Sequence, residues 1–317
     1  MNSYSPPPWL PGSHPQTAYP ALFLGHTAPA CRREPWDTPD GDFIDLDWLD
    51  GPPDKPWVAL FHGLEGNSRS HYAVALMAAL RRRGWSGVVP HFRGCSGRPN
   101  RLPRAYHSGD SAEIGWILRR LKTLAGPRPL FAMGISLGGN ALLKWLGETA
   151  EQAGNTVQGA AAVCPPVDVR VSAENFEAGL GPLYARHFLR TLKPKSLEKL
   201  QRFPGLYDAR AVARARTFRE FDELVTAPIH GFSGALDYWT RASSKPWLPR
   251  IRIPTLLLHT RNDPFFPAGH LPQPGEVSSQ VVLDIQPEGG HVGFVTGPFP
   301  GRLQWLPERI LNFFTQI

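Results

Sequence analysis

The sequence predicts an α/β fold built on a mostly parallel, doubly wound sheet with helices on both faces and a helical cap insertion. Short, wholly apolar runs alternate with helix-length segments from residue 57 onward, as is typical of strands buried on both faces. The alternation stops over residues 171–245 and then resumes. The hydrophobic fraction of 42% and the charged fraction of 19% suit a chain of 317 residues with a large core.

The predicted elements follow in order along the chain. Residues 1–35 look irregular. Residues 42–48 alternate apolar and acidic side chains, which is typical of a strand with one face exposed to solvent. Apolar runs predict further strands at 57–61, 87–90, 129–133, 160–164, 254–259 and 280–285. The remaining patterns predict helices near 70–83, 111–124, 139–150 and 303–314.

Residues 171–245 contain helix-like patches at 180–192 and 208–224 and no convincing buried strand. Both ends of this stretch return to the same predicted sheet. We therefore expect a cap over the carboxyl edge of the sheet instead of an independent domain. The expected single domain spans residues 1–317, with its core at about 36–170 and 246–317.

The chain is basic, with a net charge of +7 and an isoelectric point near 9.5. Its basic clusters at 81–83, 98–104 and 193–202 are short, and none is interleaved with aromatic side chains. Such clusters are usually solvated surface, so we expect no nucleic-acid partner. The sequence carries no signal for the oligomeric state.

The cysteines are Cys31, Cys95 and Cys164, an odd set without the spacing of a zinc site or a disulfide framework. Residues 1–12 are rich in proline and lack the pattern of a secretory signal. No apolar run reaches the roughly 18 residues that a membrane span needs. We therefore expect a cytoplasmic protein without a transmembrane segment or a bound metal, and peripheral contact with a membrane stays open.

A candidate nucleophile, Ser136, lies in the motif Gly134-Ile135-Ser136-Leu137-Gly138. The apolar strand 129–133 precedes the motif and a helical pattern follows it. In this setting a tight turn raises the serine hydroxyl above the sheet and places the next backbone N–H beside it. Ser233 also follows a glycine two residues earlier, but it lacks the preceding strand and the second glycine of the motif.

A serine nucleophile needs a base and an orienting acid, and with this turn they follow in the order acid, then histidine. Asp263 comes just after the predicted strand 254–259, which brings it to the same sheet edge; capping of the turn before Pro264 is its alternative role. His291 lies in a glycine-bearing loop after the last predicted strand, and structural packing is its alternative. The sequence thus predicts a triad of Ser136, Asp263 and His291.

An oxyanion needs two hydrogen-bond donors. The backbone N–H of Leu137 is the first candidate because it follows the nucleophile. The loop 61–66 after the first core strand supplies the second candidate, the backbone N–H of Leu64. The alternative is that this loop is an ordinary glycine turn without a catalytic role. This chemistry requires neither a metal nor an organic cofactor.

Several blocks extend these motifs along the chain. They are Trp9-Leu10, His14-Pro15-Gln16-Thr17, His62-Gly63-Leu64-Glu65-Gly66-Asn67-Ser68, Arg93-Gly94-Cys95-Ser96-Gly97, Pro99-Asn100-Arg101, Tyr106-His107-Ser108-Gly109, Gly134 to Asn140, Asn262-Asp263-Pro264-Phe265, and Glu288 to Phe294. Together they resemble the YheT-like branch of the α/β-hydrolases over nearly the whole chain.

This resemblance implies the α/β-hydrolase fold and a carboxylic-ester hydrolase, with relatives linked to short-chain esterase, monoacylglycerol or phospholipid lipase, and alcohol acyltransferase activities. It carries the triad roles onto Ser136, Asp263 and His291. Many relatives have an acidic pair where this chain has Asn262-Asp263, so here Asp263 has no competing carboxylate.

The favoured reaction is hydrolysis of a carboxylic ester, of short-chain or acylglycerol type, through an acyl-enzyme on Ser136. The expected substrate is a small-molecule ester with an apolar acyl chain. An alcohol acyltransferase using the same triad is the alternative, and a catalytically silent binding protein on a hydrolase scaffold is a further one. No triad role follows from the pattern for Cys95, Arg101 or His107.

Overall fold

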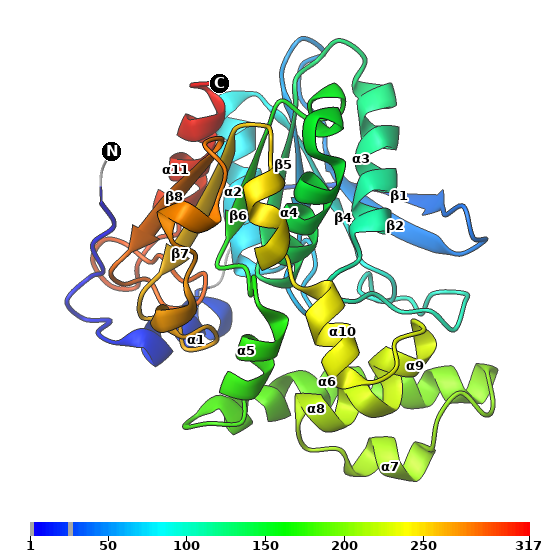
Figure 1. Ribbon diagram of the computed structural model, residues 1–317. Coiled ribbons are helices and arrows are strands. Elements are labelled where there is room, and N and C mark those ends of the chain that lie inside the picture. Colours follow the sequence, from blue (N-terminus) through cyan, green and yellow to red (C-terminus); the bar gives the residue numbers. More distant parts are fainter. Residues whose placement is uncertain (1–2, 25–27) are drawn as a thin grey trace.

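The computed structural model describes residues 3–24 and 28–317, and an eight-stranded sheet forms its centre (Figure 1). The strands are β1 (Arg32–Asp37), β2 (Phe43–Leu49), β3 (Trp57–Phe61), β4 (Ser86–Pro90), β5 (Leu130–Ile135), β6 (Gly159–Val163), β7 (Thr255–Thr260) and β8 (Val281–Gln286). Their spatial order is β1-β2-β4-β3-β5-β6-β7-β8. The β1–β2 and β2–β4 pairs are antiparallel and all other pairs are parallel, which confirms the predicted mostly parallel sheet.

Helices cover both faces of the sheet. The helices outside the cap are α1 (Ser13–Leu22), α2 (His71–Arg83), α3 (Ser111–Ala125), α4 (Leu137–Thr149) and α11 (Trp305–Phe314). Helices α3 and α4 pack with one buried cluster, and α2 and α11 pack with the other. Ala59 and Phe61 of β3 join the first cluster, whereas Val58 and Leu60 join the second. Alternate strand residues therefore face opposite layers, which explains why the strands are continuously apolar.

The stretch between β6 and β7 is wholly described and contains helices and turns but no strand. Its helices are α5 (Val169–Asn175), α6 (Gly181–Arg202), α7 (Ala209–Arg214), α8 (Phe218–Phe221), a π-helical turn (Asp222–Thr226), α9 (Ala227–Ile229) and α10 (Ala235–Ala242). Figure 1 shows α6 to α9 gathered beyond one end of the sheet, with α5 and α10 leading to and from it. This is the helical cap insertion of the predicted fold.

The helical pattern predicted over 208–224 is not one helix in the structure. Helix α7 ends at Arg214, and Thr217 starts α8 by accepting a hydrogen bond from the Glu220 N–H while the Glu220 carboxylate accepts one from the Thr217 N–H. Such a reciprocal cap stabilises a new helix start at the expense of continuation. The pattern at 180–192 instead extends to Arg202 as α6.

The prediction of an irregular segment over residues 1–35 is wrong in part. Residues 13–22 form α1, and residues 32–35 begin β1; residues 1–2 and 25–27 lie outside the described part of the chain. Helix α1 contains Pro20 and little amphipathic pattern, so contacts with the body rather than local sequence stabilise it. Pro35 is tolerated because β1 is an edge strand. Within the described residues, no helix has the length and apolar character needed to cross a membrane.

Candidate active site

Ser136 lies at the tight turn between β5 and α4, with φ of 51° and ψ of −119°. The turn is possible because neighbouring glycines let the backbones approach. A Cβ on Gly138 would lie 2.5 Å from the carbonyl oxygens of Phe61 and His62, and a Cβ on Gly134 would lie 2.5 Å from the Gly138 carbonyl oxygen. The serine is thus held in a left-handed conformation by its surroundings, as expected for a nucleophile presented at a sheet edge.

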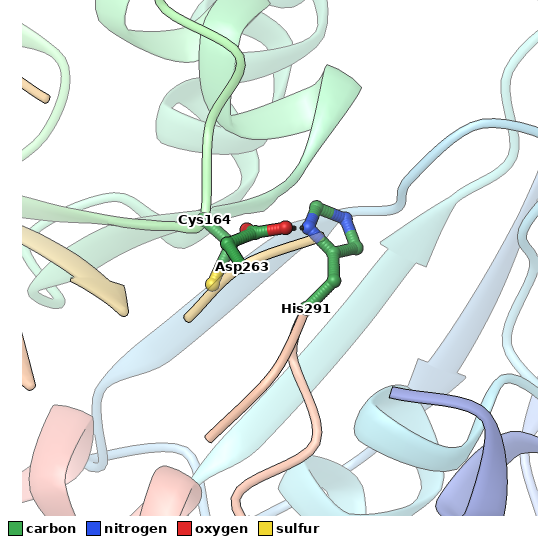
Figure 2. A group of neighbouring side chains, drawn as sticks. All are labelled: Cys164, Asp263 and His291. Atoms are coloured by element: carbon green, nitrogen blue, oxygen red, sulfur yellow. Dashed lines mark hydrogen bonds and ion pairs between the residues drawn. The ribbon is translucent and has the colours of Figure 1, made fainter. Parts of the chain in front are cut away.

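Asp263 and His291 form a hydrogen-bonded pair beside that edge, with 2.8 Å between His291 Nδ1 and Asp263 Oδ2 (Figure 2). Asp263 follows β7 and its side chain is fully buried, whereas the His291 side chain is 11% exposed. The second carboxylate oxygen accepts the Phe265 N–H at 2.7 Å. An ionised carboxylate only accepts, so Nδ1 carries the proton and Nε2 is left free to act as a base.

A second histidine, His259, lies 3.8 Å from the same carboxylate oxygen, yet it is unsuited to catalysis. Its ring is wholly buried, and its Nδ1 accepts the Thr260 N–H at 2.9 Å. Burial lowers its pKa, so the ring stays neutral. His259 therefore does not compete with His291 for the role of base.

Cys164 follows β6 directly and lies beside the acid, as Figure 2 shows. Burial, together with the charge of Asp263, raises the pKa of its thiol well above the usual value, so it is not a thiolate nucleophile. One donor atom each from Cys164, Asp263 and His291 lie within 4.8 Å of one another. A metal bound there would have to replace the proton on His291 Nδ1, so the arrangement suits a triad better than a metal centre.

Residues 63–66 form a tight turn that faces Ser136 and is here called the oxyanion turn, after the role predicted for it. The Gly66 N–H donates to the Gly63 carbonyl at 3.0 Å, and Glu65 has a φ of 56°, as in a type II turn. The Gly63 N–H donates to Tyr72 Oη, and the Glu65 N–H donates to Tyr106 Oη.

The Leu64 N–H is consequently the one amide of the oxyanion turn for which the described residues supply no acceptor. The N–H of Leu137, the first residue of α4, has no acceptor within its own helix. A Cβ on Gly63 would lie 3.4 Å from Ser136 Cβ, so this turn and Ser136 face each other closely. Both predicted amide donors are thus available near Ser136.

Helix α1 holds the two loops that carry the acid and the histidine, a contribution that the sequence did not predict. Thr17 Oγ1 accepts the His291 N–H at 2.8 Å. Gln16 Oε1 accepts hydrogen bonds from Asn262 Nδ2 and from the Gly289 N–H. The only sequence signal was the block His14-Pro15-Gln16-Thr17, because these contacts join residues from opposite ends of the chain.

A family model for the alpha/beta hydrolase fold matches residues 56–298. The chain belongs to the α/β-hydrolase family. It is 39% identical to the YheT protein of Escherichia coli K12, whose name assigns it as an esterase, over 95% of this chain and 90% of that protein. It is 28% identical to human phospholipase ABHD3, over 99% of this chain and 78% of that protein.

A solved structure of the same fold is the Pyrococcus furiosus esterase Pf2001, with a TM-score of 0.58 and 16% identity over 92% of this chain and 96% of that one. These findings confirm the predicted fold and the YheT-like family, and with them the class of hydrolases that act on carboxylic esters. The order of the site residues along this α/β-hydrolase, serine then acid then histidine, is the usual one for the fold.

A cavity of about 910 Å³ lies between the cap of this hydrolase and the sheet edge, and Ser136 and His291 both line it. Its wall is mainly apolar. The Phe265 ring packs against the His291 ring with 4.4 Å between centroids and a tilt of 40°, and Phe176 and Tyr184 pack on Phe265 at 4.8 Å each. An apolar group bound here would lie beside the candidate triad.

The block residues without a predicted role fall into three settings. Burial raises the pKa of the Cys95 thiol to about 12, which excludes it as a nucleophile. The Arg101 side chain is 53% exposed and pairs with Asp37 on the surface. His107 lines the cavity, and burial lowers its pKa to about 4, so it is neutral at pH 7. None of the three touches the Asp263–His291 pair.

Proposed function

We propose that this hydrolase cleaves carboxylic esters through an acyl-enzyme on Ser136. His291 Nε2 takes the serine proton as Oγ attacks the ester carbonyl. The Leu64 and Leu137 amides then stabilise the tetrahedral oxyanion, and Asp263 stabilises the imidazolium. The imidazolium returns its proton to the departing alcohol. A water molecule, deprotonated by His291, releases the acid and regenerates Ser136.

The observation that carries this proposal is the 2.8 Å contact between His291 and Asp263 at the wall of the cavity that Ser136 also lines. A histidine held in this way by a buried carboxylate has its base nitrogen turned away from the acid and toward the cavity side. The left-handed backbone of Ser136 and the available amides of Leu64 and Leu137 supply the other parts of the same reaction.

The substrate proposed for this site is a small ester whose acyl chain is apolar. The support is the mainly apolar cavity of about 910 Å³, large enough for an acyl chain together with a small alcohol group. The names of two relatives, phospholipase ABHD3 and a monoacylglycerol lipase of Saccharomyces cerevisiae, point toward acylglycerol-type esters.

The test is labelling by a fluorophosphonate probe together with turnover of p-nitrophenyl esters of increasing chain length. Ser136→Ala should lose both, because the probe and the ester are attacked by the same oxygen. Ser233→Ala, at the other glycine-flanked serine, is the matched control and should keep both. Full labelling of Ser136→Ala would refute the proposed nucleophile. Adding a small alcohol and measuring free acid against new ester separates hydrolysis from acyl transfer.

A further inference from the structure

Glu65 occupies an unusual place in the oxyanion turn. Its φ of 56° lies in the left-handed region, which is unfavourable for a non-glycine residue. The residue that follows the Leu64 amide is therefore held by its surroundings and not by its own preference. The Leu64 N–H shares its peptide unit with the Gly63 carbonyl, which accepts the Gly66 N–H at 3.0 Å across the turn. Because Glu65 lies inside this closed turn, the contacts that hold Glu65 also hold the peptide that carries the Leu64 N–H.

Tyr106 makes the first of these contacts. Its hydroxyl accepts the Glu65 N–H at 2.9 Å and donates to Glu65 Oε1 at 2.9 Å, so one phenol binds both the backbone and the side chain of Glu65. The Tyr106 ring stacks on Phe92 at 5.3 Å. Tyr106 therefore attaches Glu65 to the body of the enzyme, outside the cap.

The second contact comes from the cap. Lys195 Nζ on α6 lies 2.8 Å from Glu65 Oε2. The Glu65 side chain is only 8% exposed, whereas that of Lys195 is 42% exposed. Both residues line the cavity, together with Leu64 and Ser136. The two carboxylate oxygens of Glu65 thus bind different parts of the molecule, one the body and the other the cap.

We propose that cap helix α6 sets the oxyanion hole through the Lys195–Glu65 ion pair, so that the hole is fully ordered only when the cap is docked. Glu65 and Lys195 are positioning residues: they act on the transition state through the Leu64 amide. This inference rests on the proposed function, because it assumes that the Leu64 N–H stabilises an oxyanion. An ordinary surface ion pair would contribute little to stability and nothing to catalysis.

The consequence is a specific kinetic signature. Loss of the ion pair should weaken binding of the transition state and leave binding of the ester ground state nearly unchanged. We expect Lys195→Met to lower kcat about tenfold with KM nearly constant, less than the roughly 10²- to 10³-fold effect of losing a whole oxyanion donor. Lys195→Arg, which keeps the charge, should restore most of kcat.

The experiment compares wild type, Lys195→Met, Lys195→Arg, Glu65→Gln and the Glu65→Gln/Lys195→Met double variant. Arg190→Met is the matched control, because Arg190 is an exposed cation on the same helix. Each is assayed for kcat and KM on a p-nitrophenyl ester and for inhibition by a trifluoromethyl ketone, which forms a hemiketal oxyanion with an active serine. Melting temperatures establish that each variant is folded.

The proposal expects Lys195→Met to weaken trifluoromethyl ketone inhibition by the same factor as kcat, and the double variant to be no worse than Glu65→Gln. It is overturned if Lys195→Met behaves like Arg190→Met, if only KM changes, or if the two substitutions are additive. An active wild type that depends on Ser136 but shows one of these results leaves the proposed function intact. A wild type without turnover or probe labelling removes the proposed function and this inference with it.

Discussion

Asp263 has both carboxylate oxygens occupied, one by the Phe265 N–H and the other by His291 Nδ1. The backbone bond fixes the carboxylate, and the fixed carboxylate in turn fixes the tautomer and the orientation of the imidazole. Burial and the charge of Asp263 raise the pKa of the neighbouring Cys164 thiol, so this thiol adds no negative charge beside the ring. These contacts hold the carboxylate and the imidazole in the arrangement that the proposed triad requires.

Replacing that acid tests the role. Asp263→Asn keeps the shape but presents an N–H to His291 Nδ1, which favours the wrong tautomer, so kcat should fall by about 10⁴-fold. Asp168→Asn is the control: Asp168 caps α5 by accepting the Val171 N–H, and asparagine caps equally well. Steady-state kinetics on a p-nitrophenyl ester measure both variants. An Asp263→Asn enzyme as active as the control would remove Asp263 from the triad.

Asp222 in the cap is an acid whose charge is unfavourable in the fold. Burial raises its pKa to about 6, although Thr226 Oγ1 and Trp239 Nε1 donate to it. The folded state binds an extra proton between about pH 4 and pH 6, so this group's contribution to stability falls as the pH rises through that range and stays low above it.

Asp222→Asn should therefore stabilise the protein at pH 7.5, by roughly 1–3 kcal/mol, and the gain should shrink toward pH 4. Urea unfolding at several pH values measures the difference. Asp54→Asn, at a side chain that is 70% exposed, provides the baseline and should show neither effect. A gain of equal size at every pH would contradict a titrating origin.

At the scale of elements, the strand–turn–helix unit β5–Ser136–α4 depends on the absence of side chains at its glycines. Helix α4 approaches β3 so closely that a Cβ on Gly138 would lie 2.5 Å from two backbone carbonyl oxygens. Backbone atoms cannot move aside as the end of a flexible side chain can. The close approach also fixes the start of α4, where Leu137 follows Ser136, so the packing of this helix and the proposed oxyanion donor depend on the same contact.

Gly138→Ala should consequently destabilise the enzyme by about 3 kcal/mol or more, as overpacking against a rigid backbone does, and should lower activity through displacement of α4. Gly269→Ala is the matched substitution, because nothing lies within 4 Å of its added methyl group. Thermal unfolding and probe labelling measure the two effects. Equal melting temperatures for the two variants would refute the steric argument.

At the scale of the whole molecule, a buried ion network joins the antiparallel edge of the sheet to the helical layer. Arg93 is 4% exposed and donates to Asp40 and Asp42, in the connection between β1 and β2, and to Glu113 on α3. Burial is also the main reason that the pKa of Glu113 is raised to about 7. The Arg93 guanidinium thus binds three acids from two distant segments, and Arg104 lies within 4 Å of two of them, Asp40 and Glu113.

Removing the charge of Arg93 should leave Asp42 and Glu113 buried without their most closely bound cation, since Arg104 lies farther from Glu113, at 3.6 Å. Arg93→Met should cost about 3–5 kcal/mol, the usual effect of breaking a buried pair. Arg101→Met is the control, because the Arg101 side chain is 53% exposed and its pair with Asp37 should contribute at most about 1 kcal/mol. Denaturant unfolding measures both, and equal losses would show that the network contributes no more than the surface pair.

Much of the fold could be predicted because its signals are local. The apolar runs identified the six core strands to within about two residues, and the glycine motif identified the turn at Ser136, since strand burial and a tight turn each constrain adjacent residues. The placement of Asp263 and His291 after later strands also followed from the rule that parallel strands end at one edge. The break between α7 and α8 was missed because a cap competes with a pattern that continues through it.

What the sequence alone determined is the sheet, the nucleophile turn and the order of the candidate triad. Only the tertiary structure brought Thr17 to the His291 backbone across 274 residues, Tyr106 and Lys195 to Glu65, and Arg93 to its three acids. Such contacts produce no periodic pattern in the sequence, because each depends on how the intervening segments fold and not on neighbouring residues. The candidate site residues were thus predictable from local patterns, whereas the contacts that position them were not.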